Sequence, residues 1–153
     1  KIFKNDLLFL DLEMEDEYFQ IESLYFIFEK EYIIAIYTET DMDYSGDVAK
    51  MVSLKDKKVN WTINFGGFNM SMPIYDENYI YVSTIGCICK IDYKKGKFDW
   101  KFDNLYDSGK YNSFNKPYFL NDTLLIFTSK QYDKDYPDTI VVDNKSRKII
   151  LKQ

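Results

Sequence analysis

Carboxylates are the residues of this sequence whose number and placement could do chemistry. Residues 5–49 contain 13 acids and one base, Lys30, for a net charge of −12, whereas the remainder carries +7. This imbalance predicts a face that attracts a cationic partner by electrostatic steering. The alternative is a solvated surface without a partner. The residues expected to contact the partner are Asp11, Glu13, Glu15, Asp16, Glu17, Asp41, Asp43, Tyr44 and Asp47.

The sequence lacks the usual signatures of catalysis and cofactor binding. It contains no histidine, which removes Ser-His-Asp and Cys-His nucleophilic sites and imidazole metal ligands. No glycine-rich phosphate loop occurs, and no feature fixes two carboxylates together as a glycosidase requires. We therefore expect no enzymatic activity, no cofactor and no metal.

The segment Asp41–Asp47 has acids at alternate positions and a glycine at its sixth position, which is superficially like a calcium loop. An EF-hand needs a glutamate at the twelfth position, where this sequence has Val52. We expect Glu39–Asp47 to form a polar loop that contacts the partner and binds no calcium.

Cys87 and Cys89 are the two cysteines, and they stand two residues apart. In a strand this spacing places both side chains on one face. A disulfide at this spacing would be strained, and no further thiol or imidazole completes a metal site. We expect buried, reduced thiols, which favours a cytoplasmic protein.

Residues 73–102, PIYDENYIYVSTIGCICKIDYKKGKFDWKF, show the clearest strand pattern. Short runs of β-branched and aromatic residues are separated by Asp, Asn and Gly, as in successive β-hairpins. The last run alternates, which predicts one buried face with Phe98, Trp100 and Phe102. The opposite, solvent-facing set is Lys97, Asp99 and Lys101.

Weaker copies of this unit lie on both sides of it. An alignment on Trp100 brings Trp61 and Leu151 to the equivalent place, from the segments MVSLKDKKVNW, CKIDYKKGKFDW and IVVDNKSRKIIL. Nine residues before each of these three anchor residues stands an apolar residue: Val52, Ile91 or Val142. Self-similarity at this period is typical of blade-like repeats.

The stretch KIDYKKGKFDWKF resembles the repeat of quinoprotein-type (PQQ-like) β-propeller proteins, in which an Asp, a glycine-containing turn and a Trp end each blade. The resemblance covers roughly residues 24–153 and implies four-stranded antiparallel blades, without implying a quinone cofactor. The outer two copies lack the turn glycine, and the third has Leu151 in place of Trp.

The length limits how many blades can form. At about 40 residues per blade, even the smallest closed ring needs roughly 160 residues. We therefore expect a single all-β domain over residues 1–153, a partial, open propeller of three to three and a half blades. Its repeat-like units are 24–65, 71–102 and 115–153. The chain is a fragment, an oligomer or a compact open array that binds through its exposed face.

Outside the repeats, we expect one strand over Lys1–Leu12 and polar loops over Asp103–Lys116 and Lys130–Asp138. Residues 18–28 fit either a helix or a strand, and the hairpin alignment favours a strand from Leu24 onward. No apolar run is long enough to span a membrane. The chain starts Lys1-Ile2-Phe3, so the native start, including a removed signal peptide, can lie before it.

Two functional hypotheses follow. The first is a non-enzymatic immunity or inhibitor protein that blocks the cationic cleft of a bacterial toxin, such as a nuclease. That likeness is one of class, and no motif carries it. The alternative is a scaffold or assembly module, part of a larger propeller of the bacterial envelope, whose exposed edge strand recruits a peptide. Nucleic acid and membranes are not expected partners of an acidic chain, and the oligomeric state stays open.

Overall fold

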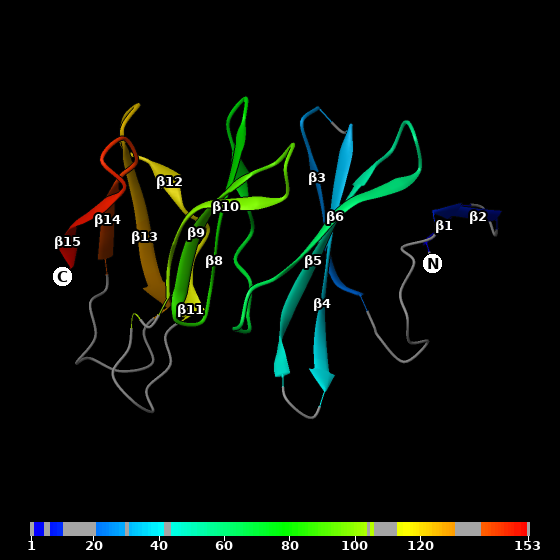
Figure 1. The fold of residues 1–153 in the computed structure, drawn as a ribbon, viewed down its shortest axis with the longest axis horizontal. Helices are drawn as coiled ribbons and strands as arrows, with labels where there is room; N and C mark the ends of the chain where they lie inside the picture. Colours follow the sequence, from blue (N-terminus) through cyan, green and yellow to red (C-terminus); the bar gives the residue numbers. More distant parts are fainter. Residues whose placement is uncertain are drawn as a thin grey trace. The chain divides into compact units, whose positions relative to one another are not determined.

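The fold consists of β-strands. The computed structural model describes residues 2–4, 7–10, 21–29, 31–41, 44–103, 105, 113–130 and 139–152. Every regular element in these residues is a strand, and every strand pair is antiparallel (Figure 1). Within this part of the chain no helix is long and apolar enough to cross a membrane. The predicted all-β class is confirmed.

The chain forms two compact units. The first comprises Lys1–Gly66 together with the turn residues Lys94–Gly96, and the second comprises Gly67–Tyr93 and Lys97–Gln153. In the first unit, β1 (Ile2–Lys4) pairs with β2 (Leu7–Leu10). A single strand over Lys1–Leu12 was therefore the wrong prediction, since the chain reverses and pairs the backbone groups of both halves.

The main sheet of the first unit has the order β3-β4-β5-β6. Residues 21–27 form a strand, so the helical alternative for this segment is wrong. The two central strands are buried along most of their described length, including Ile33–Tyr37 and Val48–Val52. The strands of this sheet are β3 (Ile21–Ile27), β4 (Tyr32–Asp41), β5 (Tyr44–Ser53) and β6 (Lys58–Asn64).

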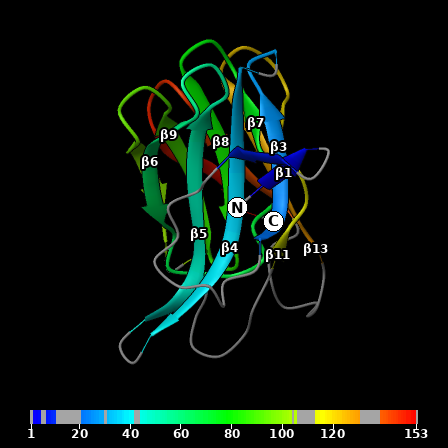
Figure 2. The same ribbon diagram turned by 90° about the vertical axis from the view of Figure 1, so that its right-hand side faces the viewer.

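The predicted polar loop Glu39–Asp47 is wrong. β4 and β5 keep their pairing through this segment, with Thr38 opposite Asp47, Thr40 opposite Ser45 and Asp41 opposite Tyr44. Figure 2 shows the two strands continuing side by side. A β-ladder is made by main-chain groups, so polar side chains do not prevent it, and Thr and Tyr favour strands.

The second unit contains two sheets. The first has the order β10-β9-β8-β7, as the sequence pattern of residues 73–102 predicted. Its strands are joined by short turns between neighbours, which accounts for their consecutive order. They are β7 (Ile74–Tyr75), β8 (Tyr79–Thr84), β9 (Cys87–Asp92) and β10 (Lys97–Phe102).

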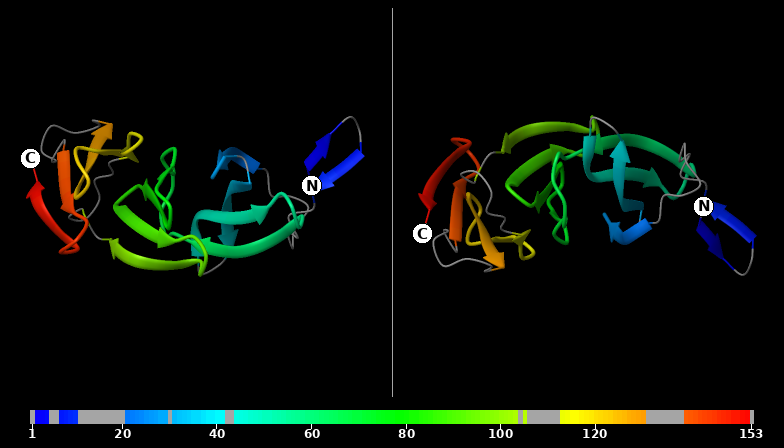
Figure 3. Two further views of the ribbon diagram at one scale, coloured as in Figure 1. Left: turned by 90° about the horizontal axis from the view of Figure 1, so that it is seen from above. Right: turned by 90° about the horizontal axis from the view of Figure 1, so that it is seen from below.

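The other sheet of this unit is built on β13, β14 and β15, which follow one another across the sheet from orange to red in Figure 3. Two short strands, β11 and β12, share the free edge of β13. Part of the loop predicted over Asp103–Lys116 is therefore wrong, because Phe114 pairs with Ser129 and is 2% exposed. Burial of this aromatic ring favours its pairing. The strands are β11 (Ser113–Phe114), β12 (Tyr118–Phe119), β13 (Leu124–Lys130), β14 (Thr139–Asp143) and β15 (Lys148–Lys152).

A hydrophobic core joins these two sheets. Aromatic rings from both take part, and the Trp100 ring lies 6.4 Å from Tyr81 and 5.2 Å from Phe102. Burying such rings supplies most of the hydrophobic stabilisation that a small β-domain has. The buried members are Tyr81, Ile88, Trp100, Phe114, Leu125, Phe127, Ile140 and Val142.

A β-bulge occurs at the same place in the last hairpin of all three repeats. Each anchor residue is paired regularly, with Met51 opposite Trp61, Lys90 opposite Trp100 and Val141 opposite Leu151. The residue before the anchor is the extra one: Asn60, Asp99 or Ile150. The alignment on Trp61, Trp100 and Leu151 therefore describes one structural position.

The turns of these hairpins are also alike. Lys57, Gly96 and Arg147 all have left-handed backbone angles, with φ of 54°, 62° and 57°. Each stands at the same place before its anchor, although only the central copy has a glycine. In the outer copies, Lys57 and Arg147 adopt a conformation that costs an L-residue about 1–2 kcal/mol relative to glycine.

The bulge changes which side chains share a face of β10. The prediction that Phe98 lies with Trp100, opposite Asp99 and Lys101, is wrong. The Lys101 ammonium lies 5.5 Å from the centre of the Phe98 ring, and the Asp99 side chain is only 14% exposed. An extra residue between Phe98 and Trp100 shifts the alternation, as a β-bulge does.

Candidate interaction surfaces

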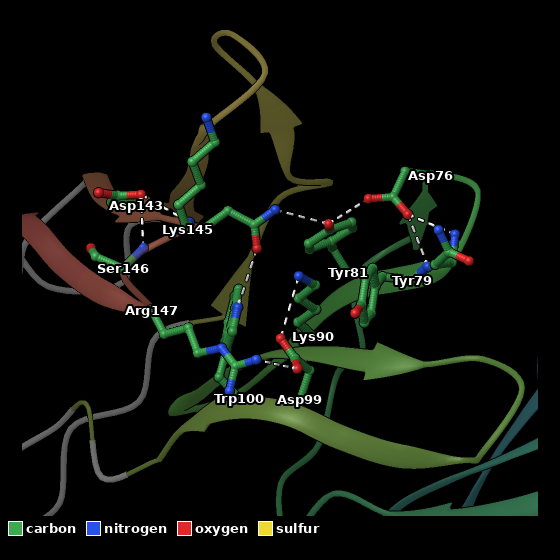
Figure 4. A network of polar contacts seen from close by, with 12 residues as sticks. Asp76, Tyr79, Tyr81, Lys90, Asp99, Trp100, Asp143, Lys145, Ser146 and Arg147 are labelled. Atoms are coloured by element: carbon green, nitrogen blue, oxygen red, sulfur yellow. Dashed lines mark hydrogen bonds and ion pairs between the residues drawn. The ribbon is translucent and has the colours of Figure 1, made fainter.

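A network of polar side chains in the second unit starts at Asp76. Its Oδ1 accepts hydrogen bonds from the backbone N–H groups of Asn78 and Tyr79, both at 2.9 Å. Its Oδ2 accepts the Tyr81 hydroxyl at 2.6 Å (Figure 4). The pKa of Tyr81 is raised, first because the phenol is buried and then because Asp76 accepts its proton.

Asn144 continues this network from the turn of the next repeat. Its Nδ2 donates to the Tyr81 oxygen at 3.0 Å, and its Oδ1 accepts the Trp100 indole N–H at 3.3 Å. Its backbone N–H donates to Thr123 O at 2.8 Å. One amide side chain therefore satisfies two buried aromatic residues, which fixes the two sheets of this unit against each other.

A second polar group surrounds the bulged residue Asp99. Arg147 donates to Asp99 Oδ1 at 2.9 Å, and Lys90 Nζ lies 3.3 Å from Oδ2 as an ion pair. The Lys90 ammonium also lies 3.7 Å from the centre of the Tyr79 ring, a cation–π contact. These contacts balance the charge of a largely buried carboxylate.

The described residues offer little for metal chemistry. No group of three or more Cys, Asp and Glu side chains among them is arranged to hold a metal ion. Cys87 and Cys89 are free thiols that are 3% and 0% exposed, as predicted. Burial is the first cause of the raised pKa of Cys89, whereas its hydrogen bond with Cys87 lowers the pKa of Cys87.

Several aromatic and aliphatic side chains on and beside edge strands of the second unit are exposed. Tyr75 on β7 is 42% exposed, and Tyr118 on β12 is 49% exposed. Leu120, directly after β12, reaches 62%. Phe119 on β12 packs edge-on against the Tyr81 ring with 5.0 Å between ring centres. We call these exposed side chains, together with Met72, the β7–β12 residues: Met72, Tyr75, Tyr118, Phe119 and Leu120.

The first unit has a second exposed apolar strand, β3. Its side chains alternate, and Leu24 and Phe26 are 40% and 57% exposed, while Ile27 is buried. Among the described strands, β3 is the outermost of its sheet and pairs with β4 alone. The sequence assigned this segment to a strand without indicating that its apolar residues face outward. The only available signal was the alternation of Glu22, Leu24 and Phe26.

The structure describes few of the residues predicted to contact a cationic partner. Asp11, Glu13, Glu15, Asp16, Glu17 and Asp43 lie outside the described residues. Asp41 and Tyr44 pair with each other at the ends of β4 and β5, where only their backbone is described. The predicted acidic face therefore stays a prediction.

Asp47 is the one member of the predicted set whose side chain is described. It is 1% exposed, and its Oδ1 lies 3.1 Å from the Thr38 hydroxyl. The same hydroxyl lies 2.6 Å from Glu22 Oε1, so its single proton is shared between two carboxylates. A carboxylate buried in this way orders β4 and β5 and offers little surface to a partner.

Comparison with known proteins identifies the fold. No family model matches the sequence, and no curated protein matches it. BamB from Moraxella catarrhalis is similar in structure, with a TM-score of 0.61 and 13% identity over 80% of this chain and 37% of BamB. A member of the DUF4221 family from Bacteroides vulgatus is 13% identical over 92% of this chain and 44% of that protein, with a TM-score of 0.49.

The likeness to BamB concerns the fold. It supports the β-propeller architecture that the repeat KIDYKKGKFDWKF implied, with antiparallel four-stranded blades. The chain spans less than half the length of either protein. The repeats described above are therefore blades of a partial propeller.

Proposed function

We propose that this protein is a non-catalytic scaffold or assembly module of the β-propeller type, which holds a protein partner on exposed edge strands. The observation that carries the proposal is the exposure of apolar side chains on and beside the edge strands β7 and β12, where Tyr75, Tyr118 and Leu120 are each more than 40% exposed. Exposed aromatic and aliphatic side chains on a rigid β-framework are typical of protein interaction sites.

The polar network supports this proposal because it holds β12 in place. Phe119 packs on Tyr81, and Tyr81 is held between Asp76 and Asn144. A strand that is already fixed loses little conformational entropy when a partner binds. The buried polar groups are occupied by one another, which favours a structural role for them over a catalytic one.

The likeness to BamB supports the propeller framework of this proposal. It does not identify a partner for this protein. A place in the bacterial envelope stays a prediction from the sequence. The inhibitor hypothesis also stays a prediction, because most of the acidic residues on which it depends lie outside the described residues. The inhibitor hypothesis and our proposal both describe a non-enzymatic protein that acts by binding.

Site-specific photo-crosslinking in the native host tests the proposal. A benzophenone amino acid replaces Tyr118, which is 49% exposed on β12. The matched control places the same group at Lys145, an exposed residue of the β14–β15 turn. We expect one protein to be captured from position 118 and not from position 145. Equal capture at both positions, or none at position 118, would contradict the proposal.

A further inference from the structure

The outer edge of β3 is suited to pairing with another extended chain. Within the described part of the chain, β3 pairs with a strand on one side only, which is β4, and β4 pairs with β5 on its other side. In an antiparallel ladder every second residue directs its N–H and C=O away from the partner strand. The pairing with β4 is regular from Ser23 to Ile27, after a register shift near Ile21. These residues therefore present a regular, strand-like edge.

The side chains on this edge do not protect it. Natural edge strands are commonly guarded by lysine, proline or an inward-pointing charge. From Leu24 to Ile27 the sequence is Leu-Tyr-Phe-Ile, and Phe26 is the more exposed of its two outward apolar residues, at 57%. Phe26 and Leu24 lie on the same face, two residues apart, as the two anchors of an added strand would require.

The charges around the edge indicate the chemistry of its occupant. Glu22 at the start of β3 is exposed, and so are Glu29 and Glu31 in the turn after it. The Thr38 hydroxyl, 2.6 Å from Glu22 Oε1, helps to hold this carboxylate in place. The surrounding segment 5–49 carries −12 in sequence. Acids at both ends of an apolar edge select a strand with basic residues at its ends.

We infer that β3 binds an extended segment of a partner protein by strand addition, with aliphatic side chains on Leu24 and Phe26 and with Lys or Arg near Glu22 and Glu29. This inference rests on the proposed function and names a partner chemistry for it. The main chain would supply affinity, and the apolar and acidic side chains would supply specificity. A segment of a partner protein is the occupant that satisfies all three features of the edge.

Fluorescence polarisation with a synthetic peptide tests the inference. The probe alternates valine and threonine over the length of β3 and ends in lysine and arginine. We expect saturable binding that weakens as salt is raised, because the flanking charges are exposed. The control peptide carries N-methyl groups on alternate residues, which remove its main-chain donors. Equal binding of the two peptides would overturn strand addition.

Protein variants locate the site. Phe26→Lys places a guarding charge on the edge, and we expect it to weaken binding by at least about tenfold. Ile150→Lys is the matched control, because Ile150 is 55% exposed on a strand of the other unit. We expect it to bind the peptide like the unaltered protein. The triple variant Glu22→Gln, Glu29→Gln and Glu31→Gln should lower both the affinity and its salt dependence.

Other occupants of β3 give distinct outcomes. If a second copy of the chain covers the edge, sedimentation will show a dimer that Phe26→Lys dissociates, and the inference about a partner segment is wrong. Peptide binding that Phe26→Lys leaves unchanged overturns it as well. Capture by the crosslinker at position 118 separates the two proposals. If the protein with an unaltered β3 captures a partner from position 118 but does not bind the peptide, the β3 inference alone is wrong.

Discussion

The indole Nε1 of Trp100 donates a hydrogen bond to Asn144 Oδ1 at 3.3 Å, although 44 residues separate them in the sequence. Trp100 ends one repeat, and Asn144 opens the turn of the following repeat. The same amide donates to Tyr81 at 3.0 Å. Through this relationship, the turn of one blade contacts the core residues of its neighbour. Replacement of Asn144 therefore tests the network directly.

Replacement of Asn144 by alanine should destabilise the second unit. Two hydrogen bonds are lost, and the Trp100 N–H is left without its acceptor in a mostly buried place. The expected decrease in the free energy of unfolding is about 1–3 kcal/mol, measured by urea denaturation. Asn115→Ala is the control, because Asn115 is exposed and bonds only to the Thr128 side chain among the contacts described for its amide. A loss equal to that of the control would show that the network contributes little.

Stability should fall at alkaline pH through Tyr81. The pKa of its phenol is raised above its ordinary value near 10, by burial and by the hydrogen bond to Asp76. Below that ordinary value the stabilising effect is fully present. Above it the unfolded chain loses the proton first, so the free energy of unfolding falls by up to about 1.4 kcal/mol per pH unit for this one group.

The measurement is urea denaturation between about pH 9 and pH 11, with Tyr81→Phe beside the unaltered protein. We expect the variant to be less stable at the lower pH, since it lacks the hydroxyl that joins Asp76 to Asn144. It should also lose less stability as the pH rises. Tyr118→Phe, on the exposed phenol of β12, should follow the unaltered protein. Parallel pH curves for all three proteins would contradict this account.

Much of the fold could be predicted from sequence because the repeat indicates the strands, the turns and the pairing of neighbouring strands together. The sequence alignment matched Trp61, Trp100 and Leu151, and the structure places a common bulge and a common left-handed turn residue beside these three positions. The hairpins could be predicted because apolar residues stand at fixed distances on both sides of each turn, and this pattern is visible in a short stretch of sequence. Glycine is the residue type expected at the left-handed turn position, and among the three repeats only Gly96 provides it. Lys57 and Arg147 nevertheless adopt the same left-handed conformation at the equivalent positions.

Other features depend on contacts that local sequence does not record. The bulge at Asp99 reverses the alternation that Phe98 and Trp100 display in sequence. The polar residues near Thr40 are paired because their main chain continues a ladder started by buried residues. The exposure of Phe26 and Tyr118 follows from their place on edge strands, which is set by sheet order and not by residue type.

Replacement of Gly96 by alanine should destabilise the protein more than the same change at Gly66. Both glycines have left-handed angles, with φ of 62° and 77°, so each substitution strains the backbone by about 1 kcal/mol. A Cβ at Gly96 also overlaps the Trp61 side chain, whereas no atom lies within 4 Å of a Cβ at Gly66. The clash should add about 1–3 kcal/mol, as overpacking does.

Urea denaturation and tryptophan fluorescence check this prediction together. The Gly96→Ala variant should show a shifted emission maximum, because Trp61 must move to admit the methyl group. Gly66→Ala should leave the emission unchanged and lose only the stability due to backbone strain. Equal stability losses in the two variants would mean that Trp61 yields without cost, and that the turn glycine is required for its backbone angle alone.

The two thiols should react slowly and unequally with a thiol reagent. Cys87 and Cys89 are 3% and 0% exposed, so labelling requires local opening of β9. Between them, the hydrogen bond with Cys89 lowers the pKa of Cys87, and burial raises the pKa of Cys89. Because Cys87 is the first residue of β9, beside the turn, and Cys89 lies two residues further into the strand, opening from the strand end should expose Cys87 first. The Cys89→Ser variant should keep the faster phase, and Cys87→Ser should keep the slower one. Both should react rapidly in urea, and rapid labelling of both thiols without urea would show that β9 is not the closed strand described here.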